Sequence, residues 1–102
     1  MNSAQIDNTD YYRLPCGRYL EDFIAWKRLD FAEGLALKYR WRAGKKDGET
    51  AEKDMAKMAH YARFIALRGC VDVEDVAQEV EAWLAEATAW NGQERPYTPP
   101  EG

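Results

Sequence analysis

The chain has 102 residues, of which 46% are hydrophobic, 13% are aromatic and 31% are charged, and its formal net charge is −4. This length predicts a single domain, and the hydrophobic content excludes an intrinsically disordered chain. The acidic balance argues against a protein that coats nucleic acid with its whole surface, although a local basic site stays open. No apolar run approaches the ~20 residues of a membrane span, so we expect no membrane partner.

The first two predicted helices lie in the N-terminal half of the chain. Residues 18–28 carry apolar side chains close to helical spacing. Asp30 then offers an N-cap, and Glu33 completes the capping-box pattern that starts a second helix. This second helix is predicted to end at Gly44. Its large apolar residues at i, i+4 and i+8 are Phe31, Leu35 and Tyr39.

Two further helices are predicted in the C-terminal half. Thr50 can cap the third helix, which ends at Gly69, and Asp72 can cap the fourth. The third helix should bury Met55, Met58, Ala59, Ala62 and Ile65. The fourth should bury Val73, Val76, Val80, Trp83, Leu84 and Ala87. We therefore predict an all-α fold, a compact bundle of about four helices, in which residues 1–92 form one domain and the proline-rich residues 93–102 form a flexible tail.

Charge is distributed unevenly along these helices. A basic run without any acidic residue contains Lys38, Arg40, Arg42, Lys45 and Lys46. An acidic run without Lys or Arg contains Asp72, Glu74, Asp75, Glu79, Glu81, Glu86 and Glu94. One interpretation is that these charges only complement the helix dipoles and form solvated faces. The other is that the basic run binds an anion such as a phosphate.

Helical spacing gives the basic run the geometry of an anion site. Lys38 and Arg42 are four residues apart and project from one helical face. Lys45 and Lys46 lie in a glycine-flanked turn, which leads into the third helix and its free N–H groups. In this interpretation the four cations converge on one phosphate.

The third helix adds Asp54, Lys57 and Tyr61 at i, i+3 and i+7, facing the same space. In the binding interpretation, Asp54 holds Mg²⁺ or accepts a proton, and Tyr61 stacks or donates a hydrogen bond. The alternative is an ordinary intrahelical ion pair with Lys57 or a salt bridge to Arg42. The turn GKKDGET lacks the residue order of a Walker A loop, and the scattered cysteines and single histidine predict no zinc site.

The stretch FAEGLALKYRWRAGKKDGETAEKDMAKMAHYARFI resembles the core motif of the SaV-like family of short bacteriophage proteins. The family's pattern is F-x-x-G-N-x-x-K-Y-x-x-R-x-G-x-K, then a polar turn, then D-x-x-K-A-x-x-Y. The matching residues are Phe31, Gly34, Lys38, Tyr39, Arg42, Gly44, Lys46, Asp54, Lys57 and Tyr61. The chain departs from the pattern at Leu35, where the family usually has Asn, and at Met58, where it has Ala.

The resemblance implies a helical, homo-oligomeric phage protein of the host cytoplasm, and it leaves two functions open. In the first, the chain is a nucleotide-binding protein or a nucleoside-monophosphate kinase that uses Mg²⁺ and ATP. Its nucleotide or phosphate ligands are then Lys38, Arg42, Lys45, Lys46 and Tyr61, and its catalytic residues are Asp54 and Lys57. In the second, the chain is a non-enzymatic effector that binds a host protein through Glu74, Asp75, Glu79 and Glu81.

Overall fold

The computed structural model describes residues 11–45 and 48–94, and these ranges contain four α-helices. The helices are α2 (Leu20–Lys27), α3 (Phe31–Ala43), α4 (Gly48–Gly69) and α5 (Val73–Ala89). Within the same ranges there is no strand, and one isolated β-bridge joins Arg13 to Tyr19. The predicted all-α class with about four helices is therefore confirmed.

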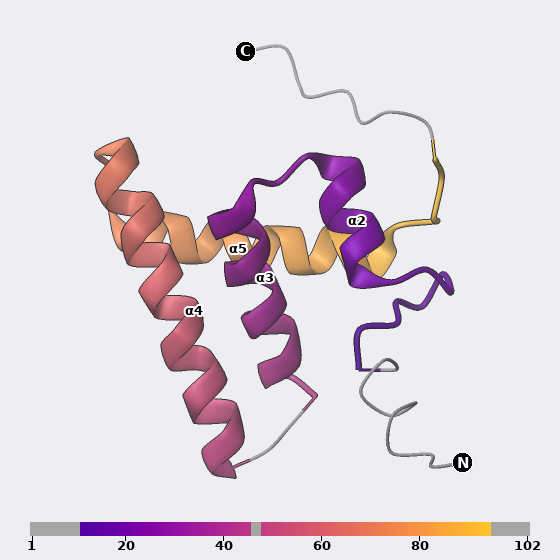
Figure 1. Cartoon of the computed structure of the whole chain (residues 1–102), viewed down its shortest axis with the longest axis horizontal. Coiled ribbons are helices and arrows are strands. Elements are labelled where there is room, and N and C mark those ends of the chain that lie inside the picture. Colours follow the sequence, from indigo (N-terminus) through magenta and orange to yellow (C-terminus); the bar gives the residue numbers. More distant parts are fainter. Residues whose placement is uncertain (1–10, 46–47, 95–102) are drawn as a thin grey trace.

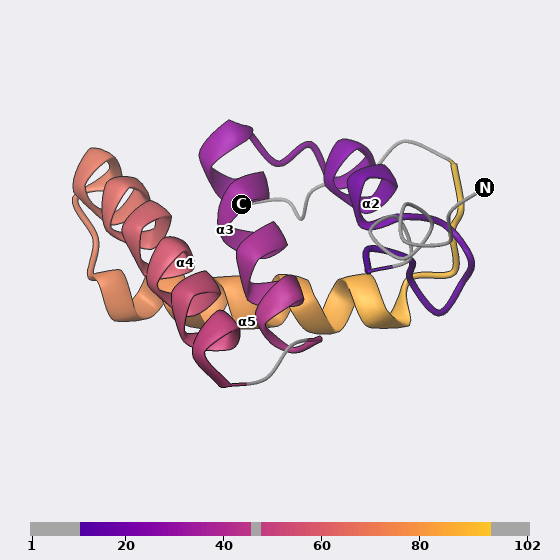
Figure 2. The ribbon, with the colours of Figure 1, turned by 60° about the horizontal axis from the view of Figure 1, so that its bottom comes forward.

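The helix α5 lies behind the others and joins them into one body (Figure 1). α3 and α4 lie side by side in front of it, and both contact α5. The view in Figure 2 shows α2 over the C-terminal part of α5. There the ammonium of Lys27 lies 2.8 Å from the carboxylate of Glu86.

Local capping hydrogen bonds explain where α3 begins, and the starts of α4 and α5 differ from this case. Asp30 accepts a hydrogen bond from the backbone N–H of Glu33 at 2.8 Å, and the Glu33 carboxylate accepts one from Asp30 at 2.9 Å. This capping box confirms the predicted start of α3. The predicted cap at Thr50 is wrong, because α4 begins at Gly48 and Thr50 lies in its first turn. The N-cap of α5 is Asp72, as predicted, although its side chain makes no capping hydrogen bond.

One hydrophobic core extends from Leu14 to Trp90 and includes residues of all four helices. Phe23 of α2, Leu37 of α3 and Val80 of α5 are completely buried at its centre. The buried residues predicted for α5 are confirmed at Val76, Val80, Trp83 and Ala87. The prediction is wrong at Val73, which is exposed because it lies in the first turn, at the edge of the core.

The buried face of α3 differs from the stripe of large apolar residues in its sequence. Phe31 is 80% exposed, and Leu35 and Tyr39 are only half-buried. The buried residues are mostly small: Ala32, Gly34, Ala36, Leu37, Trp41 and Ala43. Small residues are needed because neighbouring helices approach closely; a Cβ at Gly34 would lie 3.1 Å from Cγ2 of Ile24 in α2.

The face predicted for α4 is partly correct. Met58 and Ala62 are buried, and Ala59 and Ile65 are half-buried. Met55 is 39% exposed, because it lies at the edge of the buried face of α4. In the described ranges, no helix combines the length and the apolar character needed to cross a bilayer. The predicted flexible tail lies outside those ranges, apart from Gln93 and Glu94.

Candidate functional site

Five of the seven residues predicted for a nucleotide site lie where α3 faces α4, a region we call the α3–α4 seam. Lys38, Tyr39 and Arg42 come from α3, where Lys38 and Tyr39 lie four and three residues before Arg42 and therefore share its side of the helix. The other members are Tyr12 from the N-terminal loop and Asp54, Lys57 and Tyr61 from α4. The seam therefore unites residues from both halves of the predicted site.

Arg42 and Asp54 form a two-point ion pair within the seam. Nε and Nη2 of Arg42 donate to Oδ2 and Oδ1 of Asp54 at 3.0 and 2.9 Å, and Nη1 donates to the Tyr12 hydroxyl at 3.4 Å. The hydrogen bond from Asp54 raises the pKa of Arg42 above its ordinary value, against the effect of burial. Asp54 is 1% exposed, so its carboxylate is fully enclosed by protein. The salt bridge that the sequence left as an alternative role for Asp54 is present.

The remaining seam cations lie against tyrosine rings. Tyr39 and Tyr61 stack in parallel, with centroids 6.1 Å apart and planes inclined by 9°. The Lys57 ammonium is 5.3 Å from the Tyr39 ring centroid, and the Lys38 ammonium is 5.1 Å from that of Tyr12. Among the described residues, Lys38 and Lys57 form no salt bridge, and each ammonium lies against an aromatic face.

Lys45 and Lys46 do not join this cluster in the described structure. Lys46 lies outside the described residues. Lys45 turns to a different side of α3, where its ammonium is 4.6 Å from the ring centroid of Trp41. The structure thus divides the predicted basic run between two places.

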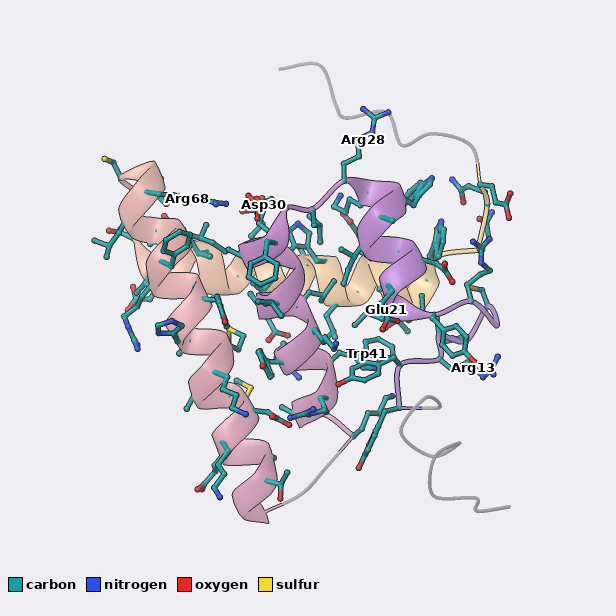
Figure 3. The ribbon with its side chains drawn as sticks, in the orientation of Figure 1. Arg13, Glu21, Arg28, Asp30, Trp41 and Arg68 are labelled. Carbon is teal, nitrogen blue, oxygen red and sulfur yellow. The ribbon has the colours of Figure 1, made fainter. Side chains whose placement is uncertain are left out.

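The second place is a hollow of about 590 Å³ beside Trp41, which we call the Trp41 hollow. It is lined by Arg13, Leu14, Pro15, Arg40, Trp41, Gly44, Lys45, Leu84 and Thr88. Figure 3 shows Trp41 beside the N-terminal loop that carries Arg13. Three cations and several apolar side chains therefore surround one space.

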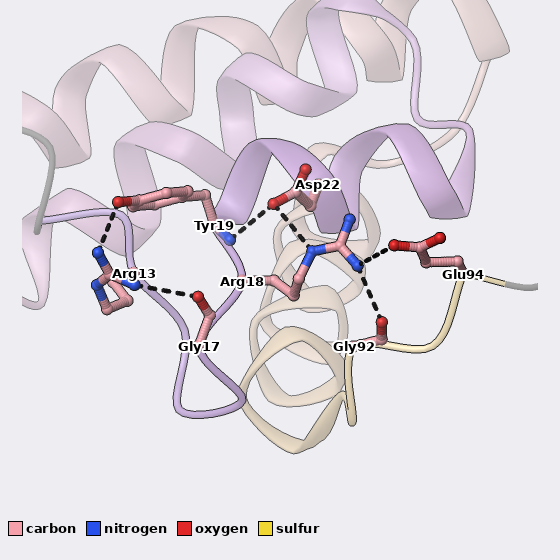
Figure 4. A network of polar contacts seen from close by, with 7 residues as sticks. All are labelled: Arg13, Gly17, Arg18, Tyr19, Asp22, Gly92 and Glu94. Carbon is pink, nitrogen blue, oxygen red and sulfur yellow. Dashed lines mark hydrogen bonds and ion pairs between the residues drawn. The ribbon is translucent and has the colours of Figure 1, made fainter.

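Hydrogen bonds to the loop hold two walls of the hollow in place. Arg13 donates to the carbonyl of Gly17 at 3.1 Å and to the hydroxyl of Tyr19 at 2.7 Å (Figure 4). The indole Nε1 of Trp41 donates to the carbonyl of Tyr11 at 2.8 Å. Arg13 and Trp41 thus have fixed positions before any ligand binds.

Arg40 supplies a third wall and links the hollow to the acidic helix α5. Its Nε and Nη2 donate to the two carboxylate oxygens of Glu81 at 2.5 and 3.3 Å. The side chain of Glu81 is 50% exposed, and that of Arg40 is 24% exposed. Glu81, predicted as a partner-binding residue, is therefore neutralised within the chain.

The other three residues predicted to bind a partner also lie on α5. Glu74, Asp75 and Glu79 are exposed, and among the residues described here they form no ion pair. Of the four carboxylates predicted to bind a partner, Glu81 is thus paired with Arg40, and the other three form no ion pair among the described residues.

Sequence reasoning missed Arg13 and Arg40 as site residues. Arg40 belongs to the basic run, so its place in that run could have indicated it. No sequence pattern indicated Arg13, because it lies in a loop distant in sequence that only tertiary packing brings to the hollow. No group of three or more metal-ligating side chains is found in the part of the chain that the structure describes.

No protein-family model matches the chain, and no curated protein or solved structure is significantly similar to it. The resemblance to the SaV-like phage proteins rests on residue spacing alone and stays a prediction. The function is therefore inferred from the geometry of the two cationic regions.

Proposed function

We propose that this chain binds a nucleotide, or a phosphorylated aromatic compound of similar size, in the Trp41 hollow. The observation that carries the proposal is the set of cations, Arg13, Arg40 and Lys45, around the space beside the Trp41 indole. Arg and Lys donors match phosphate oxygens, and the small exposed part of Trp41, which is 5% exposed, adds to the apolar wall of the space. The hollow's volume of about 590 Å³ is within the range of small-molecule sites.

The hollow is favoured over the seam because its cations can change partners. Arg42 cannot leave Asp54 without removing a bidentate ion pair from a carboxylate that is 1% exposed. Arg40 can exchange Glu81 for a phosphate, since the half-exposed Glu81 carboxylate would return to water. Lys45 is exposed, so its ammonium can turn from the Trp41 ring to a bound anion at little cost.

Phosphoryl transfer is a further step that the family resemblance implies. Asp54, the residue predicted to hold Mg²⁺ or the acceptor, is occupied by Arg42 in the seam. The described residues that line the hollow include no carboxylate that could hold Mg²⁺. We therefore limit the proposal to binding, with Mg²⁺–ATP as one of the ligands to be tested.

The test is calorimetric titration of the full chain with deoxynucleoside monophosphates and with Mg²⁺–ATP. Loss of a charge-assisted hydrogen bond should weaken nucleotide binding by about tenfold or more in Arg40→Ala and Lys45→Ala. The matched control is Lys57→Ala, which removes an exposed cation from the seam and should leave the affinity unchanged. Absence of binding at millimolar nucleotide contradicts the proposal, and a loss confined to Lys57→Ala places the site in the seam.

A substitution of Glu81 tests the exchange of partners at Arg40. Glu81→Gln removes the carboxylate that competes with phosphate, so nucleotide affinity should rise severalfold. Glu74→Gln is the control, because it removes the same charge from the same helix without touching Arg40. Equal changes in the two variants indicate a general charge effect, and this outcome excludes a direct competition.

A second function is supported by the uncompensated carboxylates Glu74, Asp75 and Glu79. Here the chain is a non-enzymatic phage effector that binds a basic surface of a host protein in the host cytoplasm. The test compares pull-downs from infected host lysate with the native chain and with a variant carrying Glu74→Gln, Asp75→Asn and Glu79→Gln. A host protein retained equally by both contradicts this function. Glu81→Gln alone should leave retention unchanged, because Glu81 is paired with Arg40.

A further inference from the structure

An aromatic groove lies beside α2 and the C-terminal end of α5, away from the Trp41 hollow. It consists of two adjoining hollows of about 450 and 340 Å³, which share Trp26, Trp90 and Gln93 in their walls. We call it the Trp26–Trp90 groove. The two indole rings have centroids 5.3 Å apart, and Phe23 meets Trp90 edge-on at 5.7 Å.

Trp90, which lines this groove, carries a hydrogen-bond donor that is enclosed by protein. The residue is 7% exposed, and its indole Nε1 has no hydrogen-bond partner among the described residues. A buried donor left without an acceptor costs about 1–3 kcal/mol, so such groups are rare in folded proteins. The groove therefore has an apolar aromatic surface, and one of its two indoles has an enclosed donor without an acceptor in the described structure.

The described chain ends at the edge of the same groove. Nη1 of Arg18 donates to the carbonyl of Gly92 and to the carboxylate of Glu94, at 3.1 Å in each case (Figure 4). Glu94 and Gln93 both line the groove. Whatever follows Glu94 in the chain therefore starts beside the two indole rings.

The sequence that follows is RPYTPPEG, residues 95–102. Pro-rich sequences favour the polyproline II conformation, which has no internal hydrogen bonds and leaves every carbonyl free as an acceptor. Segments of this kind dock into grooves lined by aromatic side chains. The acidic Glu101 also complements Arg28, which lines the groove and has no ion-pair partner among the described residues.

We propose that residues 95–102 dock in the Trp26–Trp90 groove of their own chain, against the indole rings of Trp26 and Trp90. The docked segment covers the face that α2 and the end of α5 leave open. It makes the groove an internal binding surface for a proline-rich peptide. This inference is independent of nucleotide binding, because the two hollows of the groove share no residue with the Trp41 hollow.

The test is nuclear Overhauser spectroscopy on the isotope-labelled full chain. Contacts are expected between the protons of Pro96, Tyr97, Pro99 or Pro100 and the indole rings of Trp26 and Trp90. A sample that mixes labelled and unlabelled chains distinguishes contacts within one chain from contacts between copies. Contacts only between copies, or no contacts at all, overturn the proposal.

A variant with Pro99→Ser and Pro100→Ser provides a second readout without touching the core. The Trp90 indole N–H resonance should shift in this variant as the docked segment leaves the indole ring, whereas the resonance of Trp83, buried elsewhere in the core, should stay unchanged. A synthetic RPYTPPEG peptide should then shift the Trp90 resonance of the variant more than that of the native chain. Equal shifts in both chains show that the groove is open in the native protein and overturn the proposal.

Discussion

Two arginines of α3, only two residues apart, form the same kind of ion pair in different surroundings. Arg42 binds both carboxylate oxygens of Asp54, and Arg40 binds both those of Glu81. The Asp54 side chain is 1% exposed and that of Glu81 is 50% exposed. The hydrogen-bond chemistry is alike, and burial of the carboxylate is the difference.

This difference assigns the two pairs separate roles. A buried carboxylate depends on its cation, so Arg42 is a structural member that joins α3 to α4. An exposed carboxylate can be hydrated when its cation leaves, so Arg40 is available to a competing anion. The number of cations in the basic run therefore does not predict how many can bind an anion, because Arg42 is already paired with Asp54.

The largest predicted effect follows from breaking the buried pair. Arg42→Ala leaves Asp54 charged and enclosed, so the free energy of unfolding should fall by about 3–5 kcal/mol. Chemical denaturation monitored by circular dichroism measures this loss. Replacing both partners, with Arg42→Met and Asp54→Leu, also removes the buried carboxylate and should restore most of the stability. A double variant as unstable as Arg42→Ala contradicts this electrostatic explanation.

The exposed pair should contribute much less. Arg40→Ala should lower the free energy of unfolding by at most about 1 kcal/mol, because both Arg40 and Glu81 can be hydrated. The same denaturation experiment measures this loss, and the result is compared with the loss of unfolding free energy in Arg42→Ala. If Arg40→Ala and Arg42→Ala lower the free energy of unfolding by similar amounts, the two arginines do not differ in their contribution to stability, which contradicts this interpretation.

A third arginine–carboxylate pair, at the start of α2, should have a small and pH-dependent effect. The backbone N–H of Tyr19 and then the side chain of Arg18 lower the pKa of Asp22. Asp22 therefore stabilises the fold above the unfolded-state pKa of about 3.9, and the contribution is lost as pH falls through its lower folded-state pKa. Because the pair is well solvated, Asp22→Asn should cost no more than about 1 kcal/mol at neutral pH.

The measurement is the difference in unfolding free energy between the native chain and Asp22→Asn from pH 7 to pH 2. The difference should be constant down to about pH 4 and then shrink, because the native Asp22 becomes protonated and neutral like its replacement. Arg42→Ala offers the internal comparison, since it tests a carboxylate that is buried. A difference for Asp22→Asn that grows toward low pH contradicts the assigned direction of the pKa shift.

The helices were predictable because their signals are local. The capping box of Asp30 and Glu33 and the helix ends at Gly44 and Gly69 depend on residues a few positions apart. The face of α3 was not predictable from its large apolar residues. Phe31 lies outside the core, while Gly34 lies inside it, because α2 packs against that point of α3.

The sequence by itself determined the helical class and a basic run beside an acidic one. It also placed Arg42 within reach of Asp54, since it put both at the facing ends of two consecutive helices. Only the tertiary structure decided which cations share a space. Arg13 comes to Arg40 from a distant loop, and Glu81 comes from another helix. The physical reason is that helical spacing fixes neighbours at i+3 and i+4, whereas contacts between distant segments depend on how the whole core packs.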